Sequence, residues 1–120
     1  MAVYSRVLLS GSPASGRVIP VAAVATPGTL IHTAIAGATS FDEIYLWASN
    51  VTGVAATLTI EWGGVGDPGD HMVKGYVIAA NSSPIAIVVG VVLNGGLVVR
   101  AFSGTANAIN VSGYVNRITA

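Results

Sequence analysis

The chain has 120 residues, which is enough for one domain with a single core, and it contains no cysteine. Hydrophobic residues make up 52% of the chain and charged residues 8%, whereas an ordinary soluble domain has about 25% charged residues. The formal net charge is zero, so the composition offers no basic surface to a nucleic-acid partner. Copies with so few charges repel one another weakly, and we expect the protein to form homo-oligomers.

The longest uncharged span covers residues 75–99 and has the length of a membrane-spanning helix. Turn sequences at residues 81–84 and 94–96 divide it into short pieces, so we predict no membrane partner. The N-terminus lacks the hydrophobic segment of a secretory signal. Without cysteine, the chain either works in a reducing compartment or gains stability from oligomerisation.

Residues 1–16 are predicted to form an N-terminal arm and a flexible loop, and residues 17–120 a β-sandwich domain. The arm is apolar and leads into a segment of Gly, Ser and Pro. Such an arm is either an edge strand or a segment that docks on a neighbouring subunit. The next apolar segment contains Pro20, which favours an edge strand or a bulged one.

After a strand predicted at residues 29–35, the clearest pattern lies in residues 40–62. In its first half, apolar residues alternate with a face that carries Glu43, Tyr45 and Trp47. In its second half, apolar residues alternate with a polar face that ends at Glu61, so we expect that face to be exposed to solvent. An Asn-Val-Thr-Gly turn separates the halves, and we interpret the whole as the central hairpin of an antiparallel sandwich.

A glycine-rich surface loop follows, and the rest of the chain is again strand-like. Residues 85–93 form a β-branched run that predicts a strand buried on both faces, with a bend at Gly90. Asn94-Gly95 predicts a hairpin. Further strands are predicted at residues 71–79, 97–102 and 109–116. About eight strands and no helical periodicity predict an all-β, single-domain antiparallel β-sandwich.

The titratable residues contain no catalytic motif. A hydrolase would need a serine beside His32 and Asp42, yet no serine has the spacing of a nucleophile elbow. Asp67, Asp70 and His71 could bind a metal, but Asp-Pro-Gly-Asp is first a turn sequence and lacks the alternating ligands of a calcium loop. We therefore predict a non-enzymatic protein with no catalytic, cofactor-binding or metal-binding residues.

Tyr45 and Trp47, beside Glu43, are the side chains best placed for function. Aromatic rings on the outer face of a strand can stack on a sugar ring or fill a pocket of a partner. Contact with another subunit is the interpretation that we favour over ligand binding.

Several segments, which together span almost the full length, carry a resemblance to a known group of proteins. They are RVLLSGS at residues 6–12, ATPGT at 25–29, IHTA at 31–34, FDEIYLWASN at 41–50, LTIEWGG at 58–64 and NVSGYVNRI at 110–118. In these segments the chain resembles small structural proteins of tailed-bacteriophage virions, of the capsid decoration or cement type.

The resemblance implies a jelly-roll-like β-sandwich, commonly a homotrimer, that binds the major capsid protein lattice and stabilises it against internal DNA pressure. It also implies a location on the capsid surface of the virion after synthesis in the cytoplasm of the host bacterium. An alternative is a trimeric receptor-binding module of a tail fibre or baseplate, which would bind glycans. The residues that we predict at subunit or capsid contacts are Tyr4, Arg6, Leu8, Tyr45, Trp47, Tyr76, Phe102 and Tyr114.

Overall fold

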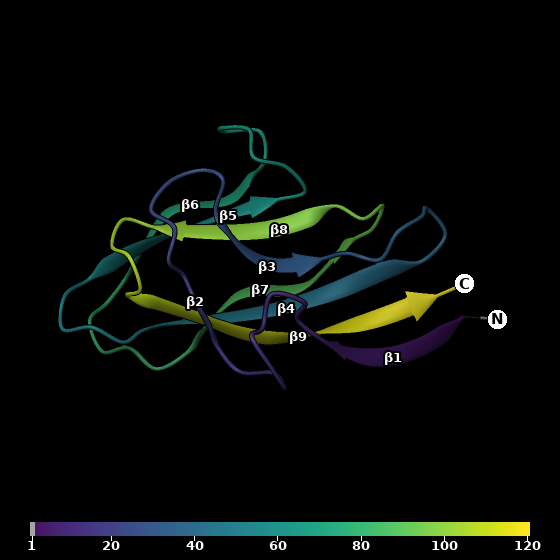
Figure 1. Ribbon diagram of the computed structural model, residues 1–120, viewed down its shortest axis with the longest axis horizontal. Coiled ribbons are helices and arrows are strands. Elements are labelled where there is room, and N and C mark those ends of the chain that lie inside the picture. The colour runs from purple at the N-terminus through teal and green to yellow at the C-terminus, as the bar shows by residue number, and fades with distance from the viewer. Residues whose placement is uncertain (1) are drawn as a thin grey trace.

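A computed structural model describes residues 2–120, which form nine β-strands in two antiparallel sheets (Figure 1). Sheet A has the order β1-β9-β4-β7, with the short β2 also paired to β9, and sheet B has the order β3-β8-β5-β6. The strands are β1 (Val3–Leu8), β2 (Ile19–Pro20), β3 (Thr29–Thr33), β4 (Phe41–Asn50), β5 (Ala56–Trp62), β6 (His71–Ile78), β7 (Ile85–Leu93), β8 (Val98–Ser103) and β9 (Ile109–Thr119). The predicted all-β antiparallel sandwich is confirmed.

The strand order is that of a jelly roll. β1 and β2 pair with successive parts of β9 and act as one interrupted edge strand. Within residues 2–120, β5 and β6 are the consecutive strands that pair with each other, while the later connections cross from one sheet to the other. The same residues include no helix that is long and apolar enough to span a membrane.

The core lies between the two sheets. Ile44, Leu46 and Ala48 of β4 point into it and are buried, as their alternation predicts. In β9, Val111 and Val115 are buried in the same way. The two central strands of sheet A therefore each have one buried face and one outer face.

The predicted hairpin at residues 40–62 is wrong, because β4 belongs to sheet A and β5 to sheet B. Asn50 ends β4 and is buried, and its Nδ2 donates to the carbonyl oxygens of Val54 and Ile78 at 2.8 and 3.1 Å. These hydrogen bonds hold a connection that passes between the sheets. Alternation reveals that a strand has one buried face, but it does not identify the neighbouring strand.

The hairpin predicted at Asn94-Gly95 is also wrong, because β7 and β8 lie in different sheets. The backbone N–H groups of Gly95 and Gly96 donate to the carbonyl oxygens of Gly37 and Ile35 at 2.9 and 3.0 Å. The turn is therefore tied to the connection between β3 and β4, and it is a corner between sheets.

β7 is an edge strand, so the prediction that it is buried on both faces is wrong. Val88 is buried, but the neighbouring Val89 is 65% exposed. The bend predicted at Gly90 is present, since this residue has a φ of +67° and the pairing with β4 shifts between Val89 and Val91.

The polar face of β5 was predicted to be exposed to solvent. This prediction is wrong at Thr59 and Glu61, which are both buried. The N–H of Gly28 donates to Glu61 Oε1 at 2.7 Å, and the hydroxyl of Thr26 donates to Glu61 Oε2. The segment between β2 and β3 thus covers this end of β5, and its donors offset the cost of burying the carboxylate.

The predicted N-terminal arm was expected to be either an edge strand or a segment that docks on a neighbouring subunit. In the structure it is an edge strand, because residues 3–8 form β1. The pairing with β9 runs from Val3 opposite Thr119 to Leu8 opposite Tyr114 without a register shift. The start of β1 and the end of β9 therefore lie side by side at this edge of sheet A (Figure 1).

Candidate functional site

The register of sheet A brings most of the predicted contact residues onto its outer face. Tyr45 of β4 lies opposite Tyr114 of β9, which in turn lies opposite Leu8 of β1. Residues that lie directly opposite each other share a face, as do residues two apart along a strand. The resulting surface, which we call the aromatic face, consists of Tyr4, Arg6, Leu8, Glu43, Tyr45, Trp47, Tyr114 and Asn116.

Three rings of the aromatic face stack on one another. The centroids of Tyr45 and Tyr114 are 4.9 Å apart with 17° between the ring planes, and Trp47 lies 6.0 Å from Tyr114. The guanidinium carbon of Arg6 lies 4.5 Å from the centroid of Tyr114. Arg6 on β1 and Tyr45 on β4 thus both contact the Tyr114 ring, from the two strands that flank β9.

Glu43 and Asn116 hold this stack in place. The hydroxyl of Tyr45 donates to Glu43 Oε1 at 2.8 Å, and Asn116 Nδ2 donates to the same oxygen at 3.2 Å. The hydrogen bond to Glu43 raises the pKa of Tyr45, because it stabilises the protonated hydroxyl beside a carboxylate. The aromatic face is thus preorganised rather than a set of freely rotating side chains.

Gly113 allows β9 to approach β4 beneath the rings. A Cβ at this position would lie 2.0 Å from the carbonyl oxygen of Tyr45, and the φ of Gly113 is +155°. The glycine therefore lets Tyr114 reach its place beside Tyr45.

Tyr76 and Phe102 do not lie on the aromatic face. Phe102 belongs to β8 in sheet B, and its ring meets the edge of the His71 ring at a centroid distance of 6.0 Å. Tyr76 lies on the edge strand β6, where it lines a hollow of about 240 Å³ with Val73 and Ile87 among its neighbours. The structure thus divides the predicted contact residues between three places.

The structure does bring His32 and Asp42 together, in the interior of the sandwich. His32 Nε2 lies 2.8 Å from Asp42 Oδ2, and the Nε and one terminal nitrogen of Arg117 bond the same carboxylate at 2.8 and 3.0 Å. Burial would raise the pKa of Asp42, but the hydrogen bonds from Arg117 and His32 outweigh it and hold that pKa below its ordinary value. Arg117 could not be assigned to this group from the sequence, because its partner Asp42 lies on another strand.

This group lacks the geometry of a hydrolase. His32 Nδ1 accepts the backbone N–H of Ser10 at 3.0 Å, so the ring proton lies on Nε2 and points to Asp42. The Ser10 hydroxyl oxygen accepts the N–H of Thr33 instead of meeting the imidazole. The Ser10 hydroxyl therefore does not occupy the position of a nucleophile beside His32.

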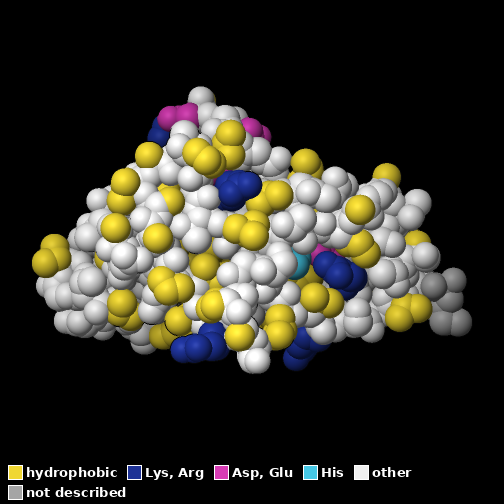
Figure 2. Space-filling model, in the orientation of Figure 1, with side chains coloured by type: hydrophobic (Ala, Val, Ile, Leu, Met, Phe, Trp, Pro, Cys, Tyr) yellow, Lys and Arg dark blue, Asp and Glu magenta, His cyan; other side chains and the backbone are white. Residues whose placement is uncertain are grey.

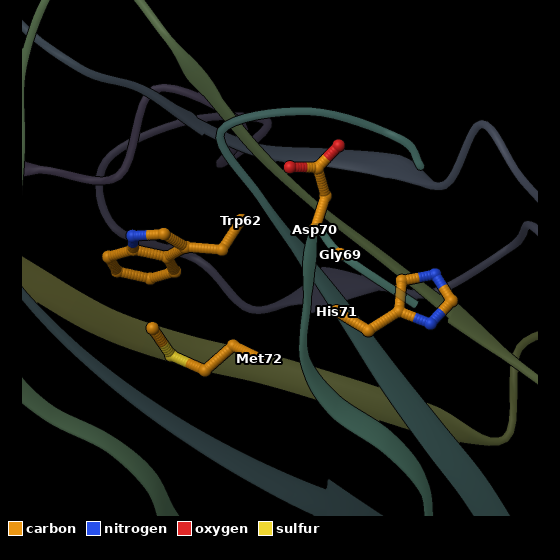
Figure 3. A pocket seen from close by; sticks show the side chains of 5 residues that line it. All are labelled: Trp62, Gly69, Asp70, His71 and Met72. Carbon is orange, nitrogen blue, oxygen red and sulfur yellow. The ribbon is translucent and has the colours of Figure 1, made fainter. Parts of the chain in front are cut away.

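The side chains of Asp67, Asp70 and His71 do not converge on a common point. Asp67 bonds Lys74 Nζ at 2.7 Å, while Asp70 Oδ2 accepts the N–H of Gly66 at 2.9 Å. Figure 3 shows the His71 ring on the other side of the strand from Trp62 and Met72, with which it lines a hollow of about 200 Å³. His71 Nδ1 lies 3.5 Å from Asp67 Oδ1, but Asp70 is not part of this contact. Across residues 2–120, no group of three or more His, Cys, Asp or Glu side chains is arranged to hold a metal ion.

No protein-family model matches the chain, and neither the curated proteins nor the solved structures provide a significant match. The resemblance to virion proteins accordingly stays a prediction from the sequence.

Proposed function

We propose that this chain is a non-enzymatic structural protein of a tailed-bacteriophage virion, which binds the major capsid protein lattice as a homo-oligomer through the aromatic face. The observation that carries the proposal is the preorganised stack of Tyr45, Trp47 and Tyr114 on an uncovered sheet face. Aromatic and arginine side chains held in place beforehand lose little entropy on binding and dominate the energetics of protein interfaces.

The low surface charge also supports the proposal. In Figure 2, basic side chains appear as separate patches, acidic ones gather mainly at the protrusion at the top, and hydrophobic groups are spread between them. Large apolar side chains exposed on or beside the aromatic face include Leu8, Val89 and Val92. Covering a surface of this kind removes apolar area from water, which is favourable, and desolvates few charged groups, which would be costly.

Cosedimentation with capsids tests the proposal. The capsids come from the phage whose genome encodes the chain, and wild type is compared with Trp47→Ala and with Val77→Ala, which removes an exposed side chain from β6. We expect Trp47→Ala to weaken binding at least about 30-fold and Val77→Ala to leave it unchanged. Wild-type protein that fails to bind capsids, or equal losses in both variants, would contradict the proposal.

The alternative of a glycan-binding tail module is favoured by one feature, the aromatic side chains that stand beside Glu43 and Asn116. Sugars stack on open ring faces, however, and the Tyr114 ring is already in contact with Arg6 and Tyr45. A glycan array separates the two functions. Binding of a glycan by wild type that is lost in Trp47→Ala would support the tail module and count against the capsid role.

A further inference from the structure

The sandwich has four edge strands, β1 and β7 in sheet A and β3 and β6 in sheet B. The free N–H and C=O groups of an edge strand can pair with another chain, and natural proteins block such pairing with bulges, charges or covering loops. The four edges can therefore be compared by asking which of them is blocked.

Three of the edges carry such protection. The free side of β3 is covered where the N–H of Gly11 donates to the carbonyl oxygen of Ile31 at 2.9 Å and the N–H of Thr33 donates to Ser10 Oγ at 2.7 Å. β7 has two register shifts against β4, and β6 has two against β5 and carries the exposed Lys74.

β1 is different. Its partners on β9 follow one another without a shift, and in the described part of the chain no loop makes a backbone hydrogen bond along its other side. Its one charged side chain, Arg6, lies over the Tyr114 ring, so it does not prevent another strand from pairing with the edge. The exposed fractions of Val3 and Tyr4 are 59% and 73%. β1 is the straight, unblocked edge of the sandwich.

We propose that the free edge of β1 pairs antiparallel with β1 of a second copy, across a twofold axis that passes between Ser5 and Ser5 of the partner subunit. The two copies of sheet A then form one continuous sheet. The segment that pairs with the free edge of β1 must be an extended strand, because only a strand can satisfy a regular row of main-chain donors and acceptors. The inference concerns self-association and does not depend on capsid binding.

The side chains of β1 indicate both that the pairing strand comes from a second copy of the chain and in which register the two strands pair. A twofold axis perpendicular to the sheet keeps the outer faces together, so opposed residues must share a face. In the register centred on Ser5, each Tyr4 lies opposite Arg6 of the partner subunit, and each Val3 opposite Val7 of the partner subunit. A register centred on Arg6 would oppose two arginines, and one centred on Tyr4 would pair fewer residues of β1.

A hollow beside the edge fits this register. It has a volume of about 390 Å³ and is lined by Tyr4, Ser5, Arg6 and Asn116. The tyrosine side chain of the partner, which lies opposite Arg6, can enter this hollow and meet the guanidinium. Pockets that take alternate side chains of an added strand provide specificity in this mode of pairing.

Sedimentation velocity with charge variants tests the pairing. We expect wild type to form a reversible dimer, Tyr4→Lys to raise its dissociation constant about tenfold by opposing Arg6, and Tyr4→Glu to preserve the dimer by pairing with Arg6. Tyr76→Lys, which changes an exposed tyrosine on β6, is the matched control and should leave the dimer unchanged. Equal weakening by Tyr4→Lys and Tyr4→Glu overturns the proposed register.

Cross-linking tests the axis directly, because the chain contains no cysteine of its own. Ser5→Cys places two thiols opposite each other at the axis, and mild oxidation should give a covalent dimer. Leu8→Cys, on the same strand but away from the axis, and Val89→Cys, on β7, should remain monomeric on a non-reducing gel. Cross-linking through Val89→Cys alone, a trimer, or a wild-type monomer at the highest soluble concentration overturns the proposal, whether or not the protein binds capsids.

Discussion

Asp42 links both sheets through a single carboxylate. It accepts four hydrogen bonds, from His32 in sheet B, from Arg117 at two nitrogens in sheet A, and from the N–H of Ile35. The carboxylate is fully buried, so these donors replace the water that it loses on folding. Removing its charge leaves Arg117 without a partner.

We therefore expect Asp42→Asn to lower the free energy of unfolding by about 3 kcal/mol, because breaking a buried ion pair leaves one group uncompensated. Urea denaturation monitored by tryptophan fluorescence measures the change. Asp67→Asn is the matched control, since it breaks the exposed pair with Lys74 and should cost less than about 1 kcal/mol. Similar losses in the two variants would show that the buried network contributes little.

The same carboxylate predicts how stability depends on pH. The pKa of Asp42 in the folded protein lies below its ordinary value of 3.8, so its contribution is fully present above that value and is lost as the pH falls through the folded pKa. Below about pH 4, wild type should therefore lose stability more steeply than Asp42→Asn. Urea midpoints measured at several acidic pH values test this, and parallel curves would contradict it.

At the scale of the strands, the close pairing of β4 with β9 depends on Gly113. We expect Gly113→Ala to lower the free energy of unfolding by at least about 2 kcal/mol, because the new methyl group would collide with the carbonyl oxygen of Tyr45. Gly53→Ala is the control, because a Cβ at that position meets nothing within 4 Å. A Gly113→Ala protein as stable as the control would show that the strands separate there without cost.

The sequence predicts the strands and their inward faces better than their partners. Alternation places Leu46 and Val111 correctly in the core, because period two reports which side of a strand is buried. It cannot show that β4 pairs with β9 and not with β5, since that choice depends on contacts far apart in the chain. Glu61 looked exposed because the covering segment between β2 and β3 leaves no periodic signal.

For the candidate site, too, the sequence predicts which way side chains face but not which side chains meet. The outward position of Tyr45, Trp47 and Tyr114 could be predicted from alternation, but their stacking could not, because it depends on the register between β4 and β9. Tyr76 and Phe102 were grouped with them by residue type alone, and the sandwich places both elsewhere. The hydrogen bond from Asn116 to Glu43 depends on the same register and could not be predicted either.

For the whole molecule, a nearly uncharged surface predicts weak salt dependence of binding. If the aromatic face binds capsids by burying apolar area, the affinity should change less than about threefold between roughly 50 and 500 mM NaCl, because salt screens charges and not apolar contacts. Cosedimentation across this range measures the dependence. A tenfold loss at high salt would assign the binding to charged groups such as Arg6.

The most direct test of the proposed capsid role is a cryo-electron microscopy map of the phage particle to which we propose that this chain belongs. We expect jelly-roll density on the outside of the shell, with the aromatic face of sheet A against the major capsid protein and away from solvent. Density for the chain at the tail, or on the shell with the aromatic face turned to solvent, would contradict it.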